Sequence, residues 1–217
     1  MLVSCWSAKG GAGTTVVSVS LAMVLARSHD AGSLLVDLAG DVPAALGLAD
    51  PGDPGLSGWL TAGSAAPADA LARLELGVGP GISVLARGTG ALTDASRAPV
   101  LAEVLAADPR PVVIDCGLIS ASPVAAVLAG AATHSLLVTR ACYLALRRAA
   151  TATVRPSGVV LVNEPGRALT RADVELVVGA PVRAEIAVDA AVARAVDAGL
   201  LAARLPRSLE RALRHAA

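Results

Sequence analysis

The chain has 217 residues, enough for one domain with a full hydrophobic core. Its 18 basic side chains balance its 18 acidic ones, so the formal net charge of +0 gives the molecule no general attraction for nucleic acid or anionic membranes. Hydrophobic residues make up 54% of the chain and its mean hydropathy is +0.64, but no apolar run reaches the roughly 18 residues of a membrane span. The first residues carry no basic leader, so we expect a cytoplasmic protein without a signal peptide.

The cysteines and histidines indicate neither a disulfide framework nor a structural metal site. Cys5, Cys116 and Cys142 form no C-x-x-C pair, and their number is odd. We therefore expect buried, reduced thiols. The three histidines share no metal-ligand spacing.

A glycine-rich stretch, S-A-K-G-G-A-G-T-T at residues 7–15, lies between an apolar run and a helical pattern. Glycines let backbone N–H groups turn toward an anion, and the following helix adds its positive N-terminal end. The stretch therefore predicts a phosphate-binding loop, with the Thr15 hydroxyl placed to reach Mg²⁺. The expected nucleotide contacts come from Lys9, Gly10, Gly11, Ala12, Gly13, Thr14, Thr15 and Val16.

The loop departs from the common pattern G-x-x-x-x-G-K-[ST], because Thr14 stands where the lysine is expected. Lys9 at its front resembles the first lysine of K-G-G-x-G-K-[ST], the deviant Walker A loop of the MinD and ParA family. That resemblance implies ATP binding, an ATP-dependent homodimer, and a catalytic Lys9 that reaches the partner's phosphates. Lys9 is also the only lysine of the chain, which indicates that an ammonium is required there. The alternative is an incidental lysine in a strand-to-helix turn.

Apolar periodicity predicts a helix over residues 14–27 and a buried strand over residues 33–37, which complete a βαβ unit. Further strands are expected at residues 2–6, 76–79, 82–86, 111–117, 134–139, 158–163 and 182–186, and further helices at residues 55–60, 98–106, 144–150 and from 170 onward. The alternation predicts a single α/β domain over residues 1–217, with a doubly wound, mostly parallel sheet. Trp59 is expected in a satellite core rather than on a binding surface.

Two predicted strands end in carboxylates. Asp37 ends the second strand, where MinD and ParA relatives read D-x-D, but Ala39 takes the second position and Asp41 lies two residues further on. The following segment, residues 40–48, resembles a shortened form of the loop in the CpaE and TadZ branch. The resemblance implies catalytic roles for Asp37 and Asp41.

Asp115, in D-C-G at the end of another apolar run, resembles the Walker B element that holds Mg²⁺ through water. The expected metal ligands are therefore Thr15, Asp37 and Asp115. The alternative reading of Asp115 is a cap on the next helix.

Near the C-terminus, Asn163 ends its strand where the MinD family places an asparagine that reads adenine. A turn-forming asparagine explains the same residue equally well. Residues 186–199 resemble the family segment beside the base, with Ala187 in place of its proline and Asp189 retained. We count Ala187 and Asp189 among the expected nucleotide contacts.

The last segment, residues 204–217, predicts a basic amphipathic helix. Its arginines share one side: Arg204, Arg207, Arg211 and Arg214. This side is either a solvated face of a docked helix or a contact for the DNA backbone or a membrane surface.

Two functions follow from the resemblance. One is a CpaE/TadZ-like scaffold that binds ATP and Mg²⁺ weakly, dimerises, and acts in polar localisation, pilus assembly or septum-site placement, peripheral to a membrane or cell pole. The other is an active ATPase that cycles on membrane or nucleoid DNA for division-site placement or partition. Thr14 and Ala39 favour the scaffold, because both replace positions on which hydrolysis depends.

Overall fold

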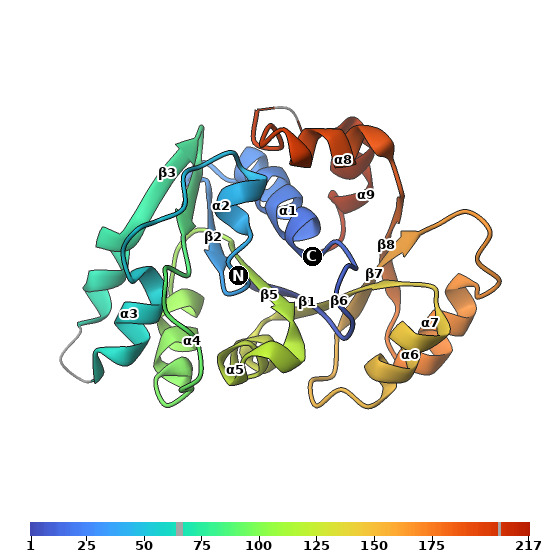
Figure 1. Ribbon diagram of the computed structural model, residues 1–217, viewed down its shortest axis with the longest axis horizontal. Coiled ribbons are helices and arrows are strands. Elements are labelled where there is room, and N and C mark those ends of the chain that lie inside the picture. The colour runs from blue at the N-terminus through green and yellow to red at the C-terminus, as the bar shows by residue number, and fades with distance from the viewer. Residues whose placement is uncertain (64–66, 204) are drawn as a thin grey trace.

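The computed structural model describes residues 1–63, 67–203 and 205–217 and contains an eight-stranded sheet with helices on both faces (Figure 1). The strands are β1 (Leu2–Ser7), β2 (Ser33–Asp37), β3 (Glu75–Gly79), β4 (Ile82–Leu85), β5 (Val112–Leu118), β6 (His134–Arg140), β7 (Gly158–Asn163) and β8 (Val182–Ala187). Their order is β3-β4-β2-β5-β1-β6-β7-β8, and only the β3–β4 pair is antiparallel. The expected doubly wound, mostly parallel sheet is thus confirmed.

Helices connect these strands along the chain. They are α1 (Thr14–Ser28), α2 (Val42–Ala45), α3 (Gly55–Thr61), α4 (Ala98–Ala106), α5 (Pro123–Ala131), α6 (Tyr143–Ala150), α7 (Arg171–Val178), α8 (Ala190–Asp197) and α9 (Arg207–Leu213), with the 3-10 helices η2 (Ala68–Leu74) and η3 (Ile119–Ala121). The sequence did not predict α5, because its run of alanine, valine and leucine gives little contrast between an inner and an outer face. The last helix is shorter than the predicted 204–217: it starts after Pro206, whose extended backbone serves as its N-cap.

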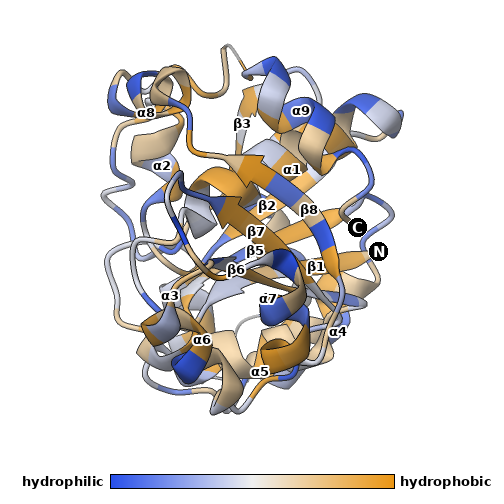
Figure 2. Ribbon diagram, turned by 90° about the vertical axis from the view of Figure 1, so that its right-hand side faces the viewer, coloured by the Kyte–Doolittle hydropathy of each residue, from blue (hydrophilic) through white to orange (hydrophobic). Residues whose placement is uncertain are grey.

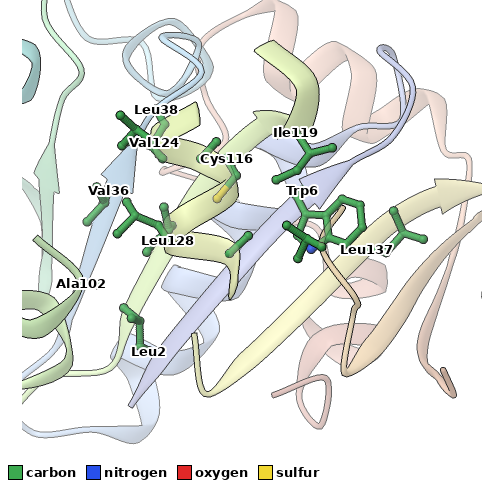
Figure 3. Packing of buried hydrophobic residues seen from close by; sticks show 14 of the residues in the cluster. Leu2, Trp6, Val36, Leu38, Ala102, Cys116, Ile119, Val124, Leu128 and Leu137 are labelled. Atoms are coloured by element: carbon green, nitrogen blue, oxygen red, sulfur yellow. The ribbon is translucent and has the colours of Figure 1, made fainter. Parts of the chain in front are cut away.

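Two hydrophobic layers hold the sheet between its helices. One face packs against α3 to α7, and the other packs against α1, α2 and α9 (Figure 1). In Figure 2 strand β7 is strongly hydrophobic, as expected for a parallel strand buried on both faces, whereas the edge strand β8 alternates between hydrophobic and hydrophilic residues. Figure 3 shows Trp6 of β1 beside Leu137 of β6 in the first layer. The indole N–H of Trp6 donates to Ser135 Oγ at 2.9 Å, so this buried polar group is satisfied.

Trp59 is buried as expected, but it belongs to the main hydrophobic layer that contains Trp6 and Leu137 and not to a satellite core. Arg97 places its guanidinium carbon 3.7 Å from the ring centroid. All three cysteines are free; Cys5 and Cys116 are buried, whereas Cys142 is only half buried. Within the described ranges, no helix combines the length and the apolar character that a membrane crossing requires.

Candidate functional site

The glycine-rich loop connects β1 to α1 at the carboxyl edge of the sheet. Gly11 and Gly13 have φ angles of 77° and 91°, in the left-handed region that other residues rarely adopt. Gly13 is the N-cap of α1 and provides no side-chain cap. The first backbone bond of the helix runs from the Val17 N–H to the Gly13 carbonyl, so none of the described residues accepts a hydrogen bond from the N–H groups of residues 10–16. A ring of free donors at a helix N-terminus is suited to an anion.

A cavity of about 570 Å³ lies over this loop. Its other walls come from the segments that follow β2, β4 and β5, which end at the same edge of the sheet. We call it the phosphate cavity. Asp41, which is exposed, and Arg87, which is half buried, are the charged side chains among its lining residues.

Asp37 and Asp115 are neighbours in the register of β2 and β5, and both are fully buried. Asp37 Oδ1 accepts a hydrogen bond from the Gly40 N–H at 2.6 Å. Asp115 Oδ1 accepts bonds from the Ser18 hydroxyl at 3.3 Å and the Gly117 N–H at 3.2 Å. The Oδ2 atom of each aspartate is buried and has no hydrogen-bond partner among the described residues.

Burial raises the pKa of Asp37 to about 6, although the bond from Gly40 and the charge of Arg87 oppose the shift. Burial also raises the pKa of Asp115 to about 7; the Thr15 hydroxyl lowers it in part, while the charge of Asp37 raises it further. Two buried carboxyl groups side by side resist joint ionisation unless a cation joins them.

These residues fit a hard divalent cation. The two unpartnered carboxylate oxygens are the ligand type that Mg²⁺ prefers, and the Thr15 hydroxyl lies beside Asp115. Mg²⁺ would be held by Asp37, Asp115 and Thr15, and its charge would favour the ionised form of both aspartates. The structure thus brings together the three expected metal ligands.

A second cavity of about 220 Å³ lies on the other side of the loop, against β7, β8 and α8. Ala12, Gly13 and Val16 line both cavities, so the two spaces lie on either side of the same segment. We call this second space the side cavity. Its walls are mostly aliphatic, and Ala187 and Asp189 line it as expected. No residue of α8 is fully buried, and this helix ends near Gly199, whose backbone touches that of Gly47 after α2.

Asn163 lies beside the side cavity but is not among its lining residues. Its side-chain amide nitrogen donates to Glu185 Oε2 at 2.8 Å, and its main-chain carbonyl accepts from the Val188 N–H at 3.0 Å. An adenine contact by Asn163 therefore stays a prediction.

The two unusual loop positions differ in their surroundings. Thr14 is 7% exposed and lines the phosphate cavity, where its side chain brings no positive charge. Lys9 is not among the lining residues; its Nζ lies 3.5 Å from the Gly10 carbonyl oxygen. Ala39 lines the cavity near Asp41 and supplies no carboxylate.

Sequence reasoning missed three residues at this edge. Ser18, one turn into α1, binds Asp115. Arg140, the last residue of β6, lines the side cavity and forms an ion pair with Glu164. Arg87 follows β4 and lines the phosphate cavity. Both arginines could have been found from their place after a predicted strand, because parallel strands bring their carboxyl ends to one edge.

The predicted basic face is in part described. Arg207, Arg211 and Arg214 are exposed, and Arg204 lies outside the described residues. The opposite face of α9 is buried against α1 and β8 through Leu209 and Leu213. Glu210 forms an ion pair with Arg27 at 2.8 Å.

Comparisons with family models and with curated proteins find no match. Solved structures match nearly the whole chain. A ParA family ATPase from Chlorobium tepidum TLS is 18% identical, with a TM-score of 0.79 over 98% of this chain and 95% of that one. MinD from Pyrococcus horikoshii OT3, in complex with Mg-ADP, is 19% identical, with a TM-score of 0.77 over 99% and 93%. An ATP complex of a McdA variant from Cyanothece is 17% identical, with a TM-score of 0.73 over 99% and 94%. The chain therefore has the fold of the ParA and MinD ATPases.

Proposed function

We propose that this chain is a MinD/ParA-like P-loop protein of the CpaE/TadZ type that binds Mg-ATP weakly and acts as a dimerising positioning scaffold. The observation that carries the proposal is the free N–H groups of residues 10–16 around a cavity into which Thr14 brings no ammonium. Backbone donors alone can hold a phosphate chain. Rapid phosphoryl transfer needs more positive charge, placed in advance around the terminal phosphate.

The nucleotide complexes of the similar folds support this assignment, since the P. horikoshii protein holds Mg-ADP and the Cyanothece protein holds ATP. Here the phosphates would lie over residues 10–16 with the metal at Asp37 and Asp115, while the base would enter the side cavity near Ala187 and Asp189. Asp41, two residues after Ala39, supplies a carboxylate to the lining of the same cavity. A role in polar localisation, pilus assembly or septum placement follows from the sequence resemblance.

The direct test is calorimetric binding of Mg-ATP and Mg-ADP, with phosphate release measured alone, with anionic vesicles, and with DNA. We expect binding in the micromolar range or weaker and negligible turnover in all three conditions. Absence of binding to either nucleotide would refute the proposal.

The second candidate is an ATPase that cycles on membrane or nucleoid DNA. It is favoured by one observation: the buried pair Asp37 and Asp115 is intact and poised for a metal. Turnover that is stimulated by vesicles or DNA would select this function over the scaffold.

Dimerisation gives Lys9 a role, because its ammonium lies outside the phosphate cavity of its own chain. In a homodimer it would reach the partner's phosphates. Lys9→Ala should abolish ATP-induced dimerisation, measured by light scattering, and leave the melting temperature without nucleotide unchanged. Equal dimerisation of the variant would contradict a role across the interface.

The exposed arginines of α9 are the proposed polyanion contact, if the protein has one. Truncation before Arg207 would also remove buried Leu209 and Leu213, so charge reversal is the cleaner test. Arg207→Glu with Arg211→Glu should weaken binding to DNA or anionic vesicles and flatten its salt dependence. Arg147→Glu with Arg148→Glu, on the exposed side of α6, is the matched control.

A further inference from the structure

Arg87 lies at the wall of the phosphate cavity, where its charge acts on Asp37 without a direct ion pair to it. Its Nη1 donates to the Ala39 carbonyl at 2.7 Å, which places the guanidinium beside the segment that follows β2. Gly40 makes room for it: a Cβ on Gly40 would lie 2.6 Å from the guanidinium carbon. Arg87 forms no ion pair with a carboxylate of the described residues, and its Nε is buried without a hydrogen-bond partner.

The unpaired N–H groups of Arg87 cost free energy unless a ligand supplies acceptors for them. An arginine has five N–H donors, and a buried donor without an acceptor costs free energy. Most other arginines with described contacts, such as Arg110 and Arg171, bind carboxylates. Arg87 instead keeps donors free at a cavity that also presents the unpaired N–H groups of residues 10–16. Both groups of donors favour a polyanion.

The sheet order tells which part of a nucleotide Arg87 would meet. The side cavity lies against β7 and β8, the loop follows β1, and Arg87 follows β4 beyond β5 and β2. A nucleotide with its base in the side cavity extends its phosphates over Ala12 and Gly13, away from β8. Each further phosphate therefore lies closer to β4.

We propose that Arg87 contacts the terminal phosphate and makes the site prefer a nucleoside triphosphate to a diphosphate, in place of the loop lysine that Thr14 replaces. This inference rests on the proposed nucleotide site and adds its specificity. The planar guanidinium can donate two parallel bonds to phosphate oxygens while Nη1 keeps its bond to Ala39. Arg87 is a ligand-contacting residue in this scheme; its bond to Ala39 also holds the wall of the cavity.

The test is the affinity ratio for Mg-ATP over Mg-ADP, measured by calorimetry for the wild type, Arg87→Gln, Arg87→Lys and the control Arg148→Gln. Arg148 is an exposed arginine on α6 that lines neither cavity. Arg87→Gln should lower the affinity for ATP by about 10- to 100-fold and the affinity for ADP by less than about 3-fold. Arg87→Lys should keep part of the preference, and the control should match the wild type.

A purely structural Arg87 gives a different result. Loss of its bond to Ala39 would then lower the melting temperature without nucleotide and lower the affinities for ATP and ADP equally. That result would overturn the proposal. A wild type that binds neither nucleotide would refute the nucleotide site itself, and that outcome is distinct from an unchanged ratio.

A measurement on the wild type covers the case in which Arg87→Gln does not fold. Modification of Arg87 by phenylglyoxal, quantified by mass spectrometry, should be slowed more by saturating Mg-ATP than by saturating Mg-ADP. Equal protection by the two nucleotides would contradict a contact with the terminal phosphate.

Discussion

The phosphate cavity and the side cavity share three loop residues but recognise ligands by different means. The phosphate cavity offers backbone N–H groups, and two buried carboxylates, Asp37 and Asp115, end the neighbouring strands without lining it; both features depend on the fold and on glycine φ angles. The side cavity offers mostly aliphatic side chains, and its nearby polar groups, such as Asn163 and Arg140, are already paired with glutamates. Substitutions should therefore change ligand affinity strongly in the phosphate cavity and weakly in the side cavity.

This contrast also explains how the loop tolerates Thr14. A phosphate held by several backbone donors and a helix end does not lose its site when one side chain is neutral. The site loses one positive charge beside the phosphates, and the loss of this charge affects hydrolysis more than binding. Under the proposed function, the chain would keep the geometry of a nucleotide site with less positive charge around the phosphates.

Asp115→Asn should have the largest effect. Both aspartates have pKa values above the ordinary value in the folded state, so the folded protein holds more protons than the unfolded one between about pH 4 and pH 7. The free energy of unfolding without ligand therefore falls as pH rises through this window. The variant should be more stable at pH 8 by on the order of 1–3 kcal/mol and have a flatter pH profile. Denaturant unfolding from pH 5 to pH 8 measures both effects.

The same variant should lose the Mg²⁺ dependence of ATP binding, because one of the two buried ligands becomes neutral. Asp30→Asn, an exposed change, is the control and should alter neither property. ATP binding that remained as dependent on Mg²⁺ in Asp115→Asn as in the wild type would remove Asp115 from the metal site.

Thr14→Lys should have the next largest effect. A restored ammonium at this buried position would add a hydrogen bond to a charged phosphate, worth about 1.5–3 kcal/mol. The affinity for ATP should therefore rise by roughly 10- to 100-fold. Turnover should stay low, because Ala39 still supplies no carboxylate. Thr93→Lys, which places an ammonium on an exposed part of the same cavity, should gain less than about 3-fold. An unchanged affinity of Thr14→Lys would mean that the loop was misread.

Asn163→Ala should have the smallest effect. The amide is engaged with Glu185 and does not line the side cavity, so ATP affinity should change by less than about 3-fold. Glu185→Ala, which frees the amide, is the matched comparison. A loss of 10-fold or more in Asn163→Ala, with unchanged affinity for a nucleotide that carries another base, would restore the adenine role.

Apolar runs and glycine spacing were sufficient to predict the sheet, the loop and the shared edge at which Asp37 and Asp115 end their strands, because parallel strands must end at one edge; that these two strands are direct neighbours came from the structure. Side-chain pairing was not predictable: the bond between Asn163 and Glu185 depends on the register of β7 and β8, which the sequence leaves undefined. Arg87 was missed because it matches no motif, although it directly follows the predicted strand at residues 82–86. Helix α5 was missed because alanine is frequent throughout the chain.

Helix α8 also affects the local stability of the molecule. None of its residues is fully buried, yet Val192 and Val196 form part of the wall of the side cavity. Segments with few buried contacts open at a small fraction of the global free energy, so the amide hydrogens of α8 should exchange with solvent much faster than those of the buried part of α1. At its C-terminal end the backbones of Gly47 and Gly199 approach closely. Binding of a ligand that bridges both cavities should therefore slow amide hydrogen exchange along α8 and leave exchange in the sheet unchanged.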